Sequence, residues 1–155
     1  MLRMTRLTDY AVALLARFAL QPGQHSAKEM AAALHLPAPA VSKVLKTLAR
    51  NGLLETHRGV KGGFTLAKPA TAISVAEVLE AFEGPLALTE CSSGHVGACE
   101  LESCCSVSGP WRRINQAMAE ALGEISLAEM VGAPHDFTHL KEAVRSRVGS
   151  RTLEV

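Results

Sequence analysis

Cysteine is the residue type whose number and spacing in this sequence most strongly indicate chemistry. All four cysteines of the 155-residue chain fall between positions 91 and 105, as Cys91, Cys99, Cys104 and Cys105. Their surroundings, ECSSGHVGACELESCCSVSGPW (90–111), are rich in Gly and Ser and show no helical or strand periodicity. Thiolates gathered in an irregular loop can bind a metal ion or a cluster, or exchange electrons as a dithiol.

Three kinds of site compete for these cysteines. Structural zinc sites usually use closely spaced cysteine pairs, and the pattern C-x7-C-x4-CC contains no such pair. A reversible dithiol sensor needs thiolates in a positive environment, whereas Glu90, Glu100 and Glu102 make this stretch acidic. An iron–sulfur cluster takes several thiolates from an irregular, widely spaced loop, sometimes with a ligand that is not cysteine. The spacing favours a cluster and leaves zinc and a redox dithiol as alternatives.

The composition favours one compact domain with an extension. Hydrophobic residues make up 48% of the chain and aromatic residues only 4%, so Leu, Val, Ala and Met must fill the core, which suits packed helices. No apolar run reaches the roughly 18 residues of a membrane span, and the first residues lack the order of a secretory signal. We expect a cytoplasmic protein, in which the cysteines serve as ligands or redox sensors rather than as structural disulfides.

Charge is divided unevenly along the chain. Residues 1–68 contain ten Lys and Arg against three acids, a balance of +7, whereas residues 69–132 contain two Arg against nine Glu, a balance of −7. A basic half joined to an acidic half suggests contact with nucleic acid at one end of the protein. The alternative is a solvated charge pattern without a partner.

Two helices are predicted at the start of the basic half. Apolar residues recur at helical spacing through LTDYAVALLARFAL (7–20), and Thr8 or Asp9 is expected to cap this first helix. Ser26 and Glu29 have the spacing of a capping box and predict the start of a second helix.

A third helix is predicted after a break at Pro37 and Pro39, and it ends at the C-cap signal Asn51-Gly52. Its polar and basic residues lie away from its apolar stripe. The second and third helices together have the pattern of a helix-turn-helix, whose second helix would enter a DNA major groove. An ordinary helix pair with a solvated basic face is the alternative. The predicted base-reading residues are Ser42, Lys43, Lys46 and Thr47.

A short hairpin is predicted directly after the third helix, at LLETHRGVKGGFTLA (53–67). Its glycines suit a turn with positive φ. Arg58 and Lys61 lie among those glycines at the tip, where they would reach phosphates or the minor groove. A hairpin in this position is a wing, so the basic half is predicted to bind double-stranded DNA.

Two further helices are expected on either side of the cysteines. Ser74 and Glu77 form a capping box for the first, and GPWRRINQAMAEALGEISLAEMV (109–131) is predicted to be one long helix. A small winged domain offers such a long helix little surface to pack against. We therefore expect the matching helix of a second chain to bury it in a symmetric dimer. Packing across its own domain is the alternative.

Several stretches of the sequence resemble the IscR/NsrR-type winged-helix regulators (the Rrf2 family), and together they span about residues 1–131. The spacing C-x7-C-x5-C followed by VSGPWRRIN (107–115) is similar to regulators of the SUF iron–sulfur assembly operon. The resemblance implies a homodimer and a cluster, mostly of the two-iron two-sulfur kind, near the dimer interface. The other runs that carry it are LTDYA (7–11), LPAPAVSKVLKTLARNGLL (36–54), RGVKGGFTLA (58–67) and ISVAEVLEAFEG (73–84).

The resemblance also implies a set of ligands. Cys91, Cys99 and Cys105 match the family's cluster ligands, which leaves Cys104 as an extra cysteine. In some members an acid from the first helix of the other subunit completes the set, and the matching residue here is Asp9.

Other members use a His shortly after the third Cys. This sequence has Val107-Ser108 there, which favours Asp9 as the remaining ligand, with His95 in the loop as an outside candidate.

The sequence therefore predicts a mainly α protein with a small β wing. The expected parts are a winged helix-turn-helix DNA-binding domain (1–84), a cluster-binding loop (85–110), a dimerisation helix (111–131) and a C-terminal tail (132–155). The expected function is a repressor of iron–sulfur assembly genes, and the alternative is a nitric oxide or redox-sensing repressor on the same scaffold. An enzyme or an adaptor for acidic proteins is disfavoured, because no catalytic motif is present and the basic wing suits DNA.

Overall fold

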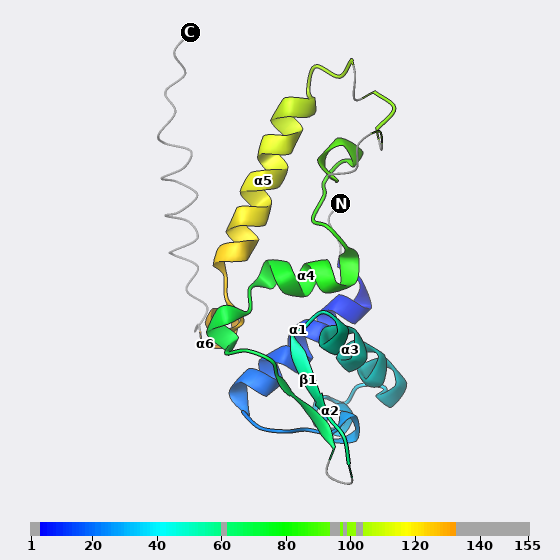
Figure 1. The fold of residues 1–155 in the computed structure, drawn as a ribbon, viewed down its shortest axis with the longest axis vertical. Helices are drawn as coiled ribbons and strands as arrows, with labels where there is room; N and C mark the ends of the chain where they lie inside the picture. Colours follow the sequence, from blue (N-terminus) through cyan, green and yellow to red (C-terminus); the bar gives the residue numbers. More distant parts are fainter. Residues whose placement is uncertain (1–3, 60–61, 94–96, 98, 102–103, 133–155) are drawn as a thin grey trace.

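The structure is a computed structural model that describes residues 4–59, 62–93, 97, 99–101 and 104–132. A winged domain forms one end of the molecule, and a long helix projects away from it (Figure 1). Lys61, His95 and the predicted tail beyond Gly132 lie outside the described residues. The fold class agrees with the prediction, because helices dominate and the described strands form one two-stranded sheet.

Helix α1 (Arg6–Leu20) forms the centre of the winged domain. It begins earlier than expected, because Thr5 is its N-cap: the Thr5 side chain accepts a hydrogen bond from the Thr8 N–H at 3.4 Å. The expectation that Thr8 or Asp9 caps this helix is therefore wrong, and the exposed Asp9 lies in its first turn. The predicted apolar stripe is buried, and its fully buried apolar members are Ala11, Leu14, Leu15 and Phe18.

The helix-turn-helix consists of α2 (Ala27–Leu34) and α3 (Ala38–Arg50). The predicted capping box starts α2, since the Glu29 N–H donates to the Ser26 hydroxyl and the Ser26 N–H donates to the Glu29 carboxylate. His35 ends α2 in the left-handed conformation, with a φ of 52°, and so turns the chain sharply toward α3.

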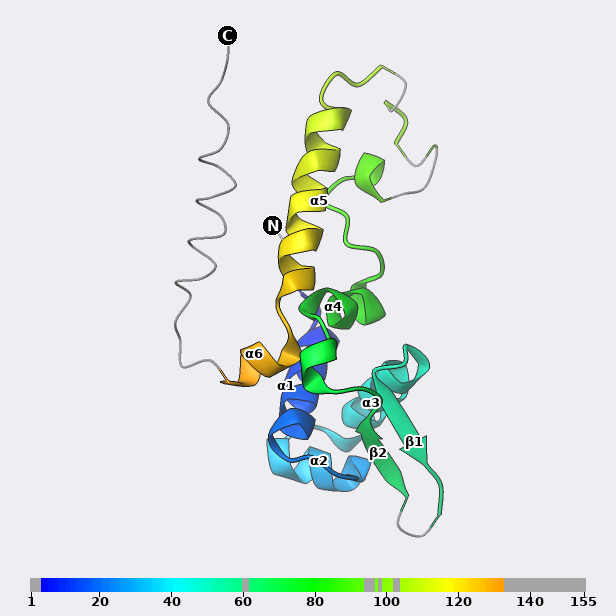
Figure 2. The ribbon, with the colours of Figure 1, turned by 60° about the vertical axis from the view of Figure 1, so that its left-hand side comes forward.

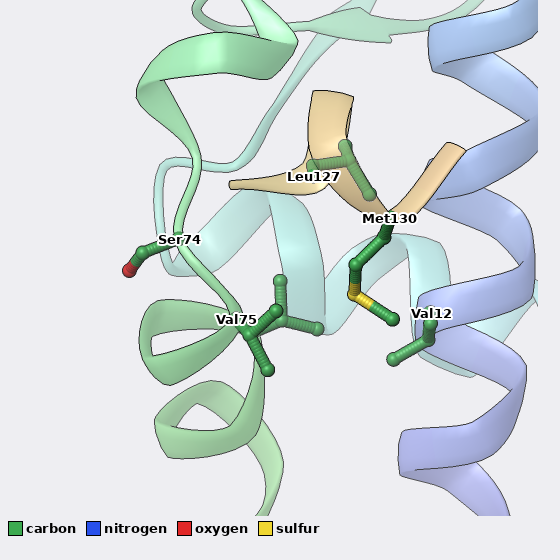
Figure 3. Close-up of a pocket in the computed structure, with 6 residues that line it drawn as sticks. Val12, Ser74, Val75, Leu127 and Met130 are labelled. Atoms are coloured by element: carbon green, nitrogen blue, oxygen red, sulfur yellow. The ribbon is translucent and has the colours of Figure 1, made fainter. Parts of the chain in front are cut away.

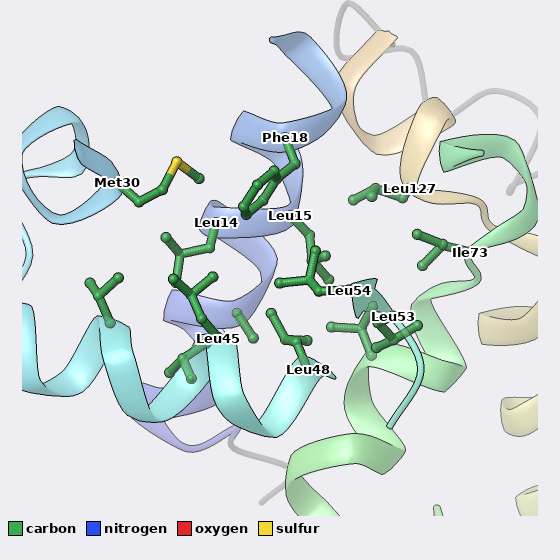
Figure 4. Packing of buried hydrophobic residues seen from close by; sticks show 14 of the residues in the cluster. Leu14, Leu15, Phe18, Met30, Leu45, Leu48, Leu53, Leu54, Ile73 and Leu127 are labelled. Atoms are coloured by element: carbon green, nitrogen blue, oxygen red, sulfur yellow. The ribbon is translucent and has the colours of Figure 1, made fainter. Parts of the chain in front are cut away.

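Helix α3 has an inner apolar face and an outer polar face. The inner face packs against α1 and against Leu53 and Leu54, which lead into the wing (Figure 4). Burying each Leu or Val side chain stabilises the fold by roughly 1.5–3 kcal/mol, so this face orients the whole helix and directs the outer face to solvent. The inner residues, each 0% exposed, are Val41, Val44, Leu45 and Leu48.

The wing is the predicted antiparallel hairpin, formed by β1 (Leu54–His57) and β2 (Gly63–Leu66). Toward the tip end of β2, the Phe64 N–H donates to the His25 carbonyl at 2.9 Å, and the His25 N–H donates to the Phe64 carbonyl at 3.0 Å. A Cβ atom on Gly63 would lie 2.6 Å from that His25 carbonyl oxygen. This glycine is therefore required by the close approach of two backbones, not by a positive φ.

Helix α4 (Val75–Glu83) follows a short 3-10 turn, η1 (Ala70–Ala72), and begins with the predicted Ser74–Glu77 capping box. Its C-terminal end meets the N-terminal end of α1 (Figure 1). Glu83, the last residue of α4, forms that junction through hydrogen bonds from Thr5 and Thr8.

The predicted single helix over 109–131 is wrong. Helix α5 (Ser108–Glu124) stops at Ile125, and a separate helix α6 (Leu127–Gly132) folds back beside α1 (Figure 2). Two sets of hydrogen bonds accompany the break. The Val75 N–H donates to the Ile125 carbonyl at 2.9 Å and the Leu127 N–H donates to the Ile73 carbonyl at 2.8 Å, while Ser126 and Glu129 form a capping box at the start of α6.

Leu127 anchors α6 in the winged domain. It is 2% exposed and faces Val12, Val75 and Met130 across a small apolar hollow (Figure 3). The hollow has a volume of about 10 Å³, which is room for about one water molecule. It is a packing defect rather than a ligand pocket.

Helix α5 itself contributes no buried residue. Trp111 and Ile114 lie one turn apart and are 39% and 50% exposed. In the described part of the chain, no helix is both long and apolar enough to cross a membrane.

Candidate functional site

The outer face of α3 brings together the residues predicted to read DNA. The exposed Lys43 and Lys46 alternate with the half-buried Ser42 and Thr47 along one shallow groove. Pro39 and Arg50 line the same groove. Arg50 is not among the predicted base-reading residues, although it lies one helical turn after Thr47 on the same polar face.

The groove carries uncompensated positive charge. Lys43, Lys46 and Arg50 are exposed, and none of them forms a salt bridge with a described residue. Helix α3 also has no acid in its first turn. A row of cations on one helix face attracts the phosphates of a nucleic acid.

The wing adds a further cation on the same half of the molecule. Arg58 is exposed just after β1, and Lys61 lies outside the described residues. Beside Arg58, a ring nitrogen of His57 lies 2.9 Å from the Thr65 hydroxyl, which links the two strands near the tip.

All four cysteines are free thiols, and they differ in exposure. Cys91, Cys99 and Cys105 are half-buried, whereas Cys104 is exposed. Cys91 lies in a short 3-10 turn, η2 (Glu90–Ser92), beside α5. This difference in exposure separates Cys104 from the three cysteines that match the family's cluster ligands.

The described chain does not gather these thiols into a closed site. Among the described residues, no group of three or more Cys, His, Asp or Glu side chains is placed to hold a metal ion. Asp9 is exposed on α1. The donor set nevertheless fits an iron–sulfur cluster in its chemistry, because Cys91, Cys99 and Cys105 are unpaired thiols on one segment.

A carboxylate joins the element before the cysteines to α1. Glu83 accepts hydrogen bonds from the Thr8 hydroxyl and, at 2.8 Å, from the Thr5 N–H. These bonds, that of Thr8 first, hold the pKa of Glu83 below its ordinary value of 4.5. A negative charge at a helix N-terminus also interacts favourably with the helix dipole.

Fold and site together define the class of this protein. A helix-turn-helix with a cationic outer face, followed by a two-stranded wing, is the architecture of a winged-helix DNA-binding regulator. Comparison with known proteins then gives the family. The sequence matches the Rrf2 family model, described as an iron-dependent transcriptional regulator, over residues 4–133, and the chain belongs to this family. It is a DNA-binding transcriptional regulator and not an enzyme.

A curated relative agrees with this assignment, and two solved structures share the fold. The chain is 31% identical to the HTH-type transcriptional regulator NsrR of Shouchella clausii, over 84% of this chain and 89% of the relative. CymR, described as the global cysteine regulator of B. subtilis, has the same fold with a TM-score of 0.65 at 22% identity, covering 85% of this chain and 98% of CymR. The IscR of T. potens matches with a TM-score of 0.62 at 24% identity, over 92% and 88% of the two chains.

Proposed function

We propose that this protein represses iron–sulfur cluster assembly genes and that a bound iron–sulfur cluster controls its affinity for DNA. The observation that carries the proposal is the position of the free thiols. Cys91, Cys99 and Cys105 lie on the one segment that joins α4 of the winged domain to the projecting helix α5. When this segment becomes ordered or disordered, the change affects both the winged domain and α5.

In this proposal Cys91, Cys99 and Cys105 hold the cluster, most often of the two-iron two-sulfur kind, and Asp9 of a second subunit supplies the remaining ligand. When bound, the cluster supplies a redox-active link between thiolates of one irregular segment. Cys104 takes no part, because two adjacent thiolates bind one metal ion only with a strained backbone.

The DNA-binding parts have separate roles. Ser42, Lys43, Lys46 and Thr47 enter the major groove, where side chains read base edges. Arg58 and Lys61 on the wing contact phosphates or the minor groove. A homodimer formed through α5 places two such units on two half-sites about one turn of DNA apart.

Anaerobic purification followed by metal analysis tests the cluster. The expected result is a brown protein with iron and sulfide in equal amounts, and a colourless protein with stoichiometric zinc would overturn the proposal. An operator is then selected from random duplexes, and its binding to cluster-loaded and cluster-free protein is compared. The two affinities should differ by roughly tenfold, the usual size of such coupling.

A nitric oxide or redox-sensing repressor is the second candidate. It is favoured by the exposed Cys104 beside the half-buried Cys105, because an accessible thiol with a neighbouring thiol suits reversible oxidation. Under this alternative, Cys104→Ser abolishes the response of DNA binding to oxidant. Under the first proposal, the response survives the substitution.

A further inference from the structure

Asn115, near the middle of α5, uses both ends of its side-chain amide on one stretch of chain. Its Oδ1 accepts a hydrogen bond from the Leu88 N–H at 2.9 Å, and its Nδ2 donates to the Leu86 carbonyl at 2.8 Å. Both bonds are partly buried. A primary amide has a donor and an acceptor side by side, so it can bracket two peptide groups of an extended chain.

The bracketed stretch leads directly to Cys91. The hydroxyl of Thr89, the next residue, lies 3.2 Å from the Cys91 sulfur and 2.8 Å from the Ser92 hydroxyl. On the same face of α5, one turn before Asn115, the Arg112 Nε donates to the Cys91 carbonyl at 3.3 Å. Cys91 is thus tied to α5 from both sides.

The other end of the cysteine segment is tied to the same helix. The Ser108 hydroxyl, in the first turn of α5, donates to the Cys105 carbonyl at 3.1 Å, and the Ser108 N–H is 3.4 Å from the same oxygen. Helix α5 is therefore the common support of Cys91 and Cys105.

We propose that Asn115 is a positioning residue of the thiol site, which fixes Cys91 relative to α5 through Leu86 and Leu88. The inference rests on the proposed function, since it assigns Asn115 the task of presenting a cluster ligand. Without the bracket, the Leu88 N–H and the Leu86 carbonyl lose partly buried partners, and the stretch detaches from the helix. Cys91 then moves independently of Cys105.

Three substitutions isolate this role. Asn115→Leu removes both hydrogen bonds, and Asn115→Asp keeps the acceptor but loses the donor to Leu86. Gln116→Leu is the matched control, because Gln116 is exposed on the same helix and its amide bonds to Glu120 within α5 at 2.9 Å. Helix α5 contributes no buried residue, so all three variants should fold, which circular dichroism checks.

The first two measurements use the full-length protein without metal. Hydrogen exchange at the Leu88 amide and iodoacetamide labelling of Cys91 should both rise by roughly tenfold in Asn115→Leu, the effect of losing two ordinary hydrogen bonds. Asn115→Asp should lie between Asn115→Leu and the parent, and Gln116→Leu should match the parent. The exposed Cys104 is the internal reference, and its labelling should stay constant.

The third measurement is the rate at which the anaerobically loaded protein loses its visible absorption to a chelator. Asn115→Leu should lose it several-fold faster than the parent, and Gln116→Leu at the parent rate. The inference is overturned if Cys91 labelling is unchanged in Asn115→Leu, or if Cys91 is freed while the chelator rate stays at the parent value. If the parent takes up no cluster, the proposed function fails, and the labelling comparison still decides whether Asn115 positions Cys91.

Discussion

At the scale of single residues, Glu83 links α4 to the start of α1. Its carboxylate holds Thr5 and Thr8 at the start of α1, and it closes α4 just before the chain departs toward the cysteines. Nothing in the local sequence marks Glu83 for this role, because the residues that it contacts lie 75 and 78 positions away.

The lowered pKa of Glu83 makes this junction sensitive to acid. Because its pKa in the folded protein is below 4.5, the ionised carboxylate stabilises the fold above the unfolded-state pKa, and this contribution is lost as the pH falls through the folded-state pKa. Glu83→Gln should therefore lower the stability at pH 7 and reduce the stability difference between pH 7 and pH 3.5. Urea unfolding at both pH values checks this. If the stability difference between pH 7 and pH 3.5 is the same in Glu83→Gln as in the parent, the ionised Glu83 does not stabilise the contact between α4 and α1.

Arg58 allows a residue-scale test of the wing. Arg58→Ala should weaken binding to the selected operator and reduce the salt slope of the binding constant by roughly one phosphate contact, while unfolding stays unchanged because the side chain is exposed. Arg58→Lys keeps the charge and should retain most of the affinity. Fluorescence anisotropy at several salt concentrations measures both, and parent-like binding by Arg58→Ala would show that the wing assignment is wrong.

At the scale of elements, the wing depends on its contact with the chain before α2. Gly63→Ala places a Cβ 2.6 Å from the His25 carbonyl oxygen, so one of the two backbones must shift. The expected cost is about 1–3 kcal/mol of unfolding free energy, as for other overpacked sites. Thermal unfolding measures it, and weaker DNA binding should follow as the wing tilts.

Gly123→Ala in α5 is the control for the wing substitution. A Cβ atom at Gly123 would meet no atom within 4 Å, and alanine favours a helix over glycine by up to about 1 kcal/mol. The control should therefore leave the protein unchanged or slightly more stable. Equal effects of the two substitutions would refute the close contact at His25.

At the scale of the whole molecule, the projecting α5 carries exposed apolar side chains that a second chain can cover. We expect Ile114→Glu to prevent dimer formation, because Ile114 is 50% exposed beside Trp111 and a charge there would be costly to bury. Sedimentation velocity should show a dimer for the parent and a monomer for the variant, with a matching loss of operator affinity.

Gln116→Glu, which adds the same charge at an exposed position on α5, is the control for the dimer test. It should remain a dimer. A parent of monomeric mass, or a dimeric Ile114→Glu, would contradict dimerisation through this face.

The order and type of most elements could be predicted from the sequence alone, because their signals are local. The capping boxes at Ser26 and Ser74, the apolar stripe of α3 and the hairpin after Asn51-Gly52 each depend on neighbours a few residues apart. The shared face of the predicted DNA-reading residues followed from the same helical period.

The distant contacts of Ile125, Thr8 and Asn115 could not be predicted from the sequence. Each depends on a backbone or carboxylate group that is distant in the sequence: Val75 for Ile125, Glu83 for Thr8, and Leu88 for Asn115. The break between α5 and α6 also has a local signal, because Ser126 and Glu129 have the spacing of a capping box and form its two hydrogen bonds. The apolar period continues through Ile125, and this continuity led to the prediction of one helix. For the cysteines too, the local spacing is visible in the sequence and indicates a cluster. The position of Cys91 depends instead on distant contacts with α5, which the sequence does not show.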